Sequence, residues 1–438
     1  MSTTPDPQRE TGDAVGPATD GALAPTAPVT PAAAGGPTDR RWSNAVREIV
    51  GGSWAVSAGA VILALIAGSI MIVATDETVR GTAAYFFTRP TDMLSAAWEA
   101  IRDAYVALFR GAVWDYKADT FAEGIRPITV SLNYATPLIG AGLGLAVGFR
   151  AGLFNIGGQG QIIFAAIGAG WIGFAVDMPW PLHMLVAIVA GIAAGALWAG
   201  IAGVLKAFTG AHEVITTIML NNIAYYLLFF MLATPGLLQA PGSANPKTPA
   251  MAESAEMPRL LGEAFPLHAG FLLALGAVAV TWWLLERSRL GFAFRAVGEN
   301  PDAARVAGID VSRVTIYVML VSGGLIGVAG VSQVLGHSTT GFSVDVDAGI
   351  GFDAITVALL GRSSPIGVLG AGVLFGAFKA GGAQMQAAEA IPIEIVTVIQ
   401  SLIVLFIAAP PLVRAIFRLP APGTASKASR RSNKEVAA

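Results

Sequence analysis

The chain has 438 residues, of which 54% are hydrophobic and 13% are charged, against about 25% charged in an ordinary soluble domain. The net charge of -2 supplies no general positive field, so nucleic acid is not expected as a partner. The absence of cysteine excludes disulfides, thiolate chemistry and cysteine metal sites. We therefore expect an all-α polytopic membrane protein embedded in lipid.

The first residues differ in composition from the rest of the chain. Residues 1–40 are rich in Pro, Ala, Thr and Gly and lack apolar periodicity, which predicts a disordered cytoplasmic tail that is too polar for a signal peptide. A first membrane span is expected at 54–74. The polar segment 75–126 that follows carries aromatic patches, and we expect it to be extracytoplasmic, with helices at the outer interface.

Nine further apolar runs bring the expected number of transmembrane helices to about ten, within a transmembrane domain at 54–418. They lie at 127–149, 155–176, 183–205, 214–233, 267–285, 314–335, 346–360, 366–383 and 395–413. The run at 346–360 is short and ends before Arg362, Ser363, Ser364 and Pro365, so it predicts either a hairpin or a discontinuous helix.

The positions of lysine and arginine predict the orientation in the membrane. With the N-terminus in the cytoplasm, ten spans place Arg150, Lys206, Arg362, the five arginines from Arg287 to Arg313 and the basic tail 419–438 on the cytoplasmic side. The loops 177–182, 336–345 and 384–394 then lie outside and contain no lysine or arginine. Both termini are expected to be cytoplasmic.

A charged island at 286–313 separates two of the apolar spans and contains the signals of a short helix. Asn300 suits the N-cap, Pro301 the first helical position and Asp302 the positive end of the helix dipole, while Gly308 can terminate the helix. A helix at 301–307 has only two turns and is not stable alone. We expect it to contact a cytoplasmic partner.

The chain lacks the motifs that would make it an enzyme. No lysine follows a glycine, so no phosphate-binding P-loop exists, and neither HExxH nor GxSxG occurs. We expect no catalytic residues, no metal site and no cofactor. The acidic residues Glu213, Asp345, Asp347, Asp353 and Glu394 lie near predicted span ends, which favours helix caps or interfacial charges and leaves an ion-coupled carrier as the weaker alternative.

Amide side chains cluster in two places within the apolar runs. The sequence RAGLFNIGGQGQ at 150–161 contains Asn155, Gln159 and Gln161 beside three glycines, where an unwound backbone and amides could bind a neutral polar ligand. The alternative is a packing turn whose amides bridge helices. In HEVITTIMLNN, at least one of Asn221 and Asn222 must face the bundle interior, because a lipid-exposed amide is costly. Helix bridging and substrate contact are both open there.

Four motifs in order resemble a known family over residues 125–412. They are ATPLIGAGLGLAVGFRAGLFNIGGQGQ, HEVITTIMLNNIA, RAVGENPDAARVAGID and ALLGRSSPIGVLG. The chain resembles the permease subunits of bacterial ABC importers of the ribose, branched-chain amino acid and nucleoside group. The nearest resemblance is to permeases that work with basic-membrane-lipoprotein type binding proteins. The nucleoside branch usually has an acidic residue where this chain has Gln159, which bears on the substrate.

The resemblance implies a type II importer permease with about ten spans in the bacterial plasma membrane, importing nucleosides or, alternatively, simple sugars. It also implies three partners: an ABC ATPase on a separate chain, a second permease subunit and an extracytoplasmic substrate-binding lipoprotein. The loop 286–313 becomes a coupling loop that contacts the ATPase. The residues assigned to this contact are Arg295, Glu299, Asn300, Pro301, Ala304 and Arg305. The spans 127–149, 155–176 and 214–233 would line the pathway, with Asn155, Gln159, Gln161, Asn221 and Asn222 as substrate contacts.

Overall fold

A computed structural model describes residues 53–243 and 245–418. The predicted tails 1–40 and 419–438 lie outside the described residues. Apart from one isolated bridge between Arg259 and His268, the regular structure in the described ranges is helical, which confirms the all-α prediction.

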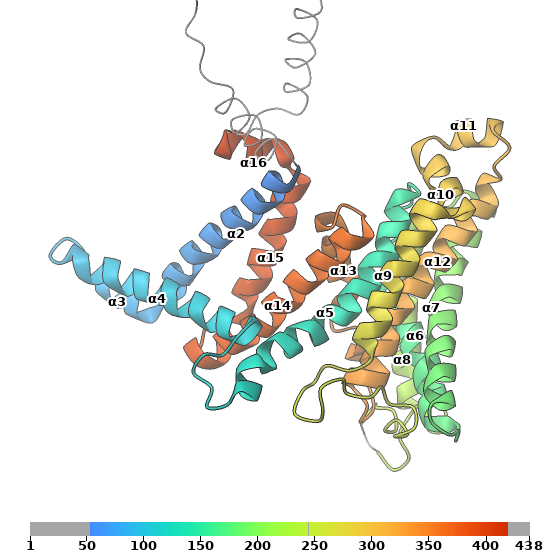
Figure 1. Cartoon of the computed structure of the whole chain (residues 1–438), viewed down its shortest axis with the longest axis horizontal. Coiled ribbons are helices and arrows are strands. Elements are labelled where there is room, and N and C mark those ends of the chain that lie inside the picture. The colour runs from blue at the N-terminus through green and yellow to red at the C-terminus, as the bar shows by residue number, and fades with distance from the viewer. Residues whose placement is uncertain (1–52, 244, 419–438) are drawn as a thin grey trace, which may run out of the picture. The chain divides into compact units, whose positions relative to one another are not determined.

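The helices follow one another with short connections, except for the segment 234–269 (Figure 1). In chain order they are α2 (Ser53–Thr75), α3 (Glu77–Ala83), α4 (Pro90–Ala112), α5 (Phe121–Arg150), α6 (Gly158–Ala175), α7 (Leu182–Thr209), α8 (Glu213–Ala233), α9 (Gly270–Arg287), α10 (Arg289–Glu299), α11 (Pro301–Val306), α12 (Val311–Ser332), the π-helix η1 (Gln333–His337), the 3-10 helix η2 (Val344–Asp347), α13 (Ile350–Leu360), α14 (Pro365–Glu389), α15 (Ile393–Ala408) and α16 (Pro410–Phe417).

Within the described ranges, seven helices are long and apolar enough to cross a membrane, and eight if the bent pair α15 and α16 counts as one span. The seven are α2, α5, α7, α8, α9, α12 with η1, and α14. The expected number of about ten is therefore not confirmed. The difference lies at α6, which is not among the seven, and at α13, which has only 11 residues.

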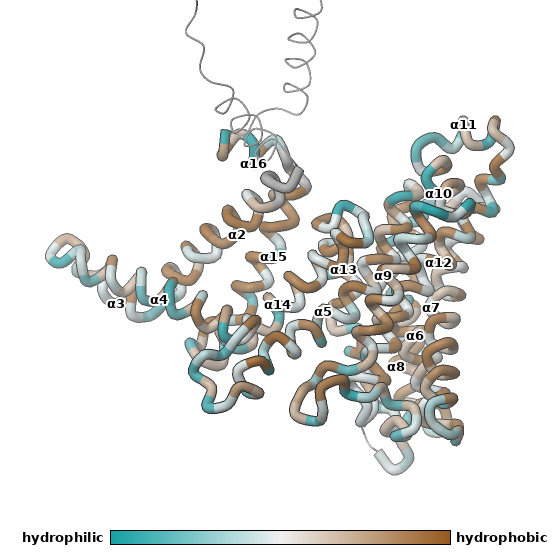
Figure 2. Tube along the Cα trace, viewed as in Figure 1, coloured by the Kyte–Doolittle hydropathy of each residue, from teal (hydrophilic) through white to brown (hydrophobic). Residues whose placement is uncertain are grey.

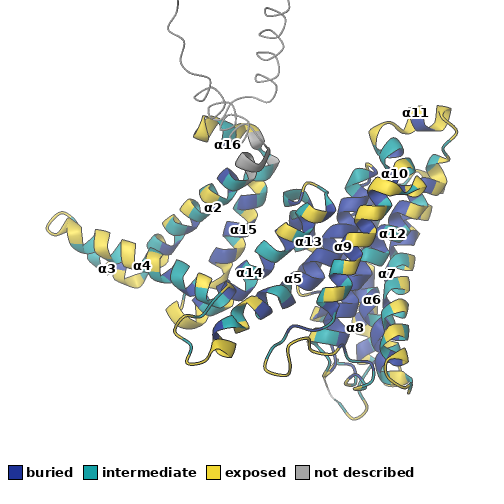
Figure 3. Ribbon diagram, in the orientation of Figure 1, coloured by how far each residue is buried: buried dark blue, intermediate teal, exposed yellow. Residues whose placement is uncertain are grey.

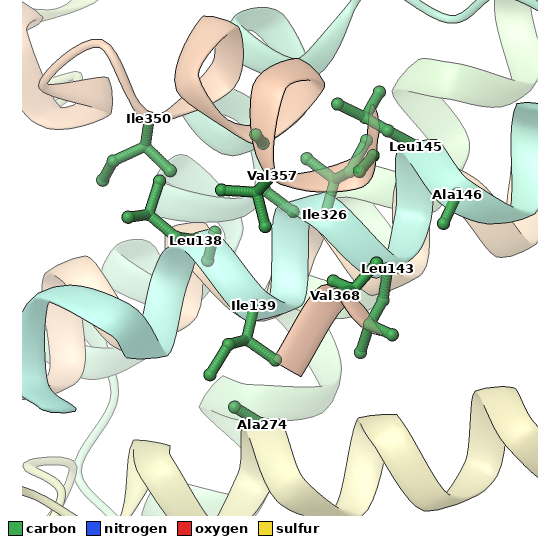
Figure 4. Close-up of a cluster of buried hydrophobic side chains, with 14 of the residues drawn as sticks. Leu138, Ile139, Leu143, Leu145, Ala146, Ala274, Ile326, Ile350, Val357 and Val368 are labelled. Atoms are coloured by element: carbon green, nitrogen blue, oxygen red, sulfur yellow. The ribbon is translucent and has the colours of Figure 1, made fainter. Parts of the chain in front are cut away.

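The core is built around α5. Its most apolar stretch is 83% buried, against 28% in α2, α7 and α8, and Figure 3 shows the same contrast. Figure 4 shows why: side chains of α5 such as Leu138 and Leu143 are surrounded by Ala274 of α9, Ile326 of α12 and Val357 of α13. The peripheral helices keep long apolar faces, visible as brown tube in Figure 2, as expected for helices in contact with lipid.

Small residues at four-residue spacing bring these helices into close contact. A Cβ on Gly195 of α7 would lie 2.8 Å from the carbonyl oxygen of Gly323 in α12 and 3.1 Å from the Cα of Gly327. Such short separations between backbones are possible only without side chains, which is how small residues drive helix association in membranes.

The helix expected to start at 127 starts earlier in the structure. Because the Thr120 hydroxyl accepts a hydrogen bond from the Glu123 amide and caps α5, this helix begins at Phe121 and not near 127. The amphipathic helix α4 packs against α14, where Gly381 lies against Leu108.

The run predicted as a hairpin or a discontinuous helix contains the 3-10 helix η2 and, after two residues, the 11-residue helix α13. Phe342 packs against Gly170 and Gly351 against Gly158, so the chain follows α6 over 12 residues, roughly 18 Å, before α13 begins. The Asp347 carboxylate then accepts a hydrogen bond from the Gly351 amide at 3.0 Å and stabilises the first turn of α13. The short helix α13 therefore starts inside the bundle.

Candidate functional site

Three segments that the sequence places on one side of the membrane lie together at one end of the bundle. The α5–α6 turn touches the C-terminal end of α10, where a Cβ on Gly298 would clash with the carbonyl oxygen of Arg150. The Arg150 guanidinium donates from Nε to the carbonyl oxygen of Ser363 at 3.1 Å, in the turn before α14. A cavity of about 450 Å³, lined by Arg150, Trp282 and Glu286 among others, opens beside these contacts.

The helix predicted in the charged island is present as α11, and it ends one residue earlier than expected, at Val306. The Asn300 side chain accepts hydrogen bonds from the amides of Asp302 (3.0 Å) and Ala303 (2.9 Å), and Gly308 has a left-handed φ of 85°. Val306 is 91% exposed. A capped helix with an apolar side chain in solvent is therefore available for contact with another protein.

The helix α10, which was not predicted from the sequence, packs against α11. The Ser288 hydroxyl accepts a hydrogen bond from the Gly291 amide and starts α10. Ala304 of α11 is 4% exposed and packs in one apolar cluster with Phe294 of α10 and Val314 of α12. This packing supplies the stability that two isolated turns lack.

The remaining residues assigned to the coupling loop have different surroundings. Glu299 and Pro301 are exposed, and Arg305 forms an exposed ion pair with Asp302 at 2.9 Å. Arg295 is half-buried, 4.0 Å from Glu286, and its Nη1 has no hydrogen-bond partner. The surface that α11 presents to solvent consists of Pro301, Asp302, Ala303, Arg305 and Val306.

Asn155 and Gln161 form a closed network with α12. The Asn155 amide nitrogen donates to Gln161 Oε1 at 3.2 Å and to Ser322 Oγ at 3.0 Å, while Asn155 Oδ1 accepts from Gln161 Nε2 at 3.0 Å and from the Gly157 amide at 2.9 Å. Asn155 is 0% exposed and Gln161 1%. Buried polar groups that are fully paired make a rigid junction.

Helix α8 presents three polar side chains, one turn apart, to the unwound backbone before α6. Glu213 Oε1 accepts from the Phe154 amide at 3.4 Å, Thr217 Oγ1 accepts from the Ile156 amide at 3.3 Å, and Asn221 donates to the Ile156 carbonyl oxygen at 2.9 Å. Asn221 Oδ1 also accepts from the Gly160 amide at 2.9 Å. The glycine-rich segment is unwound, and α8 satisfies its backbone groups.

Three of the five amide side chains predicted to contact substrate take part in hydrogen bonds around the start of α6, and the other two do not. Asn155, Gln161 and Asn221 are occupied by hydrogen bonds inside the protein, which is what the helix-bridging alternative describes. Gln159 is half-buried where α6 meets Gly351. Asn222 is exposed and donates to the Ile218 carbonyl oxygen of its own helix. Asn221 faces the bundle interior and Asn222 does not, in agreement with the prediction that at least one of them would do so.

The sequence interpretation also missed an ion pair between two apolar helices. Lys379 Nζ of α14 lies 2.7 Å from Asp353 Oδ2 of α13. Lys379 is the only charged residue in the apolar run 366–383, and that isolation was the available signal. Its partner could not be inferred, because the pairing depends on how α13 packs on α14.

Comparison with known proteins now identifies the family. Residues 128–408 match the model described as the permease component of the branched-chain amino acid transport system. The chain belongs to this permease family. This family assignment disfavours the ion-coupled carrier.

Individual permeases agree with this assignment. The chain is 34% identical to the guanosine ABC transporter permease protein of Bacillus subtilis, over 72% of this chain and 88% of that protein. It is 33% identical to a nucleoside ABC transporter permease protein of Lactococcus lactis, over 74% and 91%. A glucose ABC transporter permease protein of Haloferax volcanii is 35% identical, over 64% and 75%. No solved structure matches the chain significantly.

Proposed function

We propose that this permease is a membrane subunit of an ATP-driven importer for nucleosides. Relatives named for guanosine and nucleoside transport match the chain over 88% and 91% of their own length, which supports the substrate class. The glucose permease of similar identity makes simple sugars the second candidate. Gln159, in place of the usual acidic residue of the nucleoside branch, is one reason to test both.

The proposal includes three partner proteins. ATP must be hydrolysed on a separate ATPase chain, because this sequence has no P-loop. A second permease subunit completes the pathway, and an extracytoplasmic lipoprotein delivers the substrate. We place the complex in the bacterial plasma membrane with both termini of this chain in the cytoplasm and 75–126 outside, following the distribution of lysine and arginine.

The observation that carries the coupling part of the proposal is the exposed and capped helix α11. Two contacts connect the neighbourhood of α11 with the membrane helices. Gly298 of α10 packs against the backbone of the turn after Arg150, and Ser322 of α12 accepts a hydrogen bond from Asn155. Movement of α11 by an ATPase would therefore displace the segment 150–161 and the helix α6. In this scheme Asn155, Gln161 and Asn221 position the pathway wall, and Gln159 is the one of the five amides left to contact substrate inside the bundle.

Surface substitution on α11 tests the coupling. Ala304 is unsuitable because a bulky charge there would disrupt the cluster with Phe294 and Val314. We expect Val306→Glu, at a 91% exposed position, to abolish uptake and co-purification with the ATPase while membrane insertion persists. Leu261→Glu, at a 52% exposed position in the segment before α9, is the matched control. Normal uptake by Val306→Glu would refute the coupling role.

Reconstitution tests the substrate. The permease pair, the ATPase and the lipoprotein are placed in proteoliposomes with the lipoprotein outside, the ATPase and ATP inside, and labelled guanosine, ribose or glucose outside. The proposal expects ATP-dependent accumulation of guanosine. Accumulation of glucose without guanosine would instead establish the second candidate.

A further inference from the structure

The ion pair between Asp353 and Lys379 lies near the middle of the membrane helix α14. Lys379 is 14 residues after Pro365 and 10 residues before Glu389, so roughly 21 Å and 15 Å of helix separate it from the two ends of α14. Its side chain is 26% exposed and that of Asp353 is 32% exposed. The two charges are therefore near the middle of a membrane helix and are accessible.

Charges at this depth are costly in lipid, and they usually face a bundle interior or a water-filled space. A buried ion pair is weak evidence for stability, since replacing such a pair by apolar residues is often neutral or stabilising. Asp353 and Lys379 are only partly covered by this chain, so their polar atoms remain available to a solute beside α13 and α14.

Further polar groups gather where α13 begins. Asp347 is held by the Gly351 amide, and Gln333 donates to the Val346 carbonyl oxygen at 3.2 Å. One turn after Gln333, His337 lies 3.4 Å from the amide nitrogen of Asn133. Asn133 is 8% exposed and its Oδ1 has no hydrogen-bond partner. Discontinuous membrane helices with polar groups beside them form the substrate sites of many secondary transporters.

We propose that Asp353 and Lys379 contact the substrate as it crosses the membrane, a role that rests on the proposed function. The carboxylate accepts hydrogen bonds from hydroxyl or amine groups, and the ammonium group donates to a carbonyl, ring nitrogen or hydroxyl oxygen. The pair carries no net charge and offers no counterion to an ionic solute. It suits a neutral ring compound that carries donors and acceptors close together, such as a nucleoside or a sugar.

The test compares three variants in the proteoliposome assay at saturating loaded lipoprotein: Asp353→Asn, Lys379→Gln and the swap Asp353→Lys with Lys379→Asp. Loss of a charge-assisted hydrogen bond to substrate should lower the substrate imported per ATP hydrolysed by about tenfold or more in both single variants. The swap keeps an ion pair between the helices and exchanges donor and acceptor, so it should remain defective. Asp115→Asn is the matched control, because Arg110 and Asp115 form a comparably exposed pair at 2.8 Å outside the apolar runs.

Two results would overturn the inference. Restoration of wild-type transport by the swap would show that the pair only joins α13 to α14. The variant Asp353→Asn changes the shape of the side chain least. If it transports as much substrate per ATP as the wild type, the pair does not contact the substrate, whatever the result of the swap. If the wild-type complex imports glucose and no nucleoside, the proposed substrate is wrong, and the same variants tested with glucose still decide the inference.

Discussion

The amide nitrogen of Asn155 donates a hydrogen bond of 3.0 Å to the hydroxyl of Ser322, across 167 residues of sequence. Asn155 belongs to the unwound segment before α6, and Ser322 to the middle of α12, the helix that directly follows α11. One buried side chain therefore joins the proposed pathway wall to the helix that leads from the proposed ATPase contact.

Asn155→Ala is expected to destabilise the permease by about 2–4 kcal/mol, because it leaves Gln161, Ser322 and the Gly157 amide without partners in a buried place. Thermal unfolding in detergent measures the effect. Asn222→Ala is the matched control, since the exposed Asn222 bonds only to its own helix and its loss should change stability by less than about 0.5 kcal/mol. Equal effects of the two variants would contradict the network.

Gly298→Ala is expected to uncouple ATP hydrolysis from uptake. Its Cβ has no room against the carbonyl oxygen of Arg150, so α10 must shift, with a cost of about 1–3 kcal/mol. The measurement is the number of substrate molecules imported per ATP. Gly276→Ala in α9 meets nothing within 4 Å and serves as the control. Coupling as tight as in the wild type would show that the contact with the α5–α6 turn does not transmit movement.

The features that the sequence predicted correctly are local ones. Asn300, Pro301 and Gly308 define α11 because caps depend on residues within one or two turns. The sequence could not decide which of Asn221 and Asn222 faces inward, because the rotation of α8 is set by packing against α6. The ion pair of Asp353 with Lys379 was missed for a similar reason: it depends on the short helix α13, whose start inside the bundle is a property of the tertiary fold.

Asn300→Ala is expected to reduce ATPase co-purification and uptake, because two amides of α11 lose their acceptor at a cost of about 1 kcal/mol to a helix of six residues. Asn300→Asp should restore both, since its carboxylate caps equally well and suits the positive helix end. A shared defect in Asn300→Ala and Asn300→Asp would mean that the amide group itself, and not the cap, contacts the ATPase.

His268 is expected to make the stability of the permease depend on pH. It precedes α9, is 2% exposed, and accepts a hydrogen bond from the Gly270 amide at Nδ1 (3.1 Å), which requires that nitrogen to be unprotonated. Burial, and to a smaller degree the neighbouring His337, lowers the pKa of His268 to about 4. The unfolded chain, with an ordinary pKa of about 6.5, binds the proton more tightly than the folded chain.

The contribution of His268 to stability is therefore complete above about pH 6.5 and is lost as the pH falls toward 4, by up to about 3 kcal/mol. Melting temperatures in detergent between pH 8 and pH 5 should show this decline. His268→Gln removes the titrating group and can still accept from the Gly270 amide, so its profile should be flatter over the same range. His212→Gln, at a position whose side chain is 66% exposed, should keep the wild-type slope. A wild-type slope in His268→Gln would assign the decline to groups other than His268.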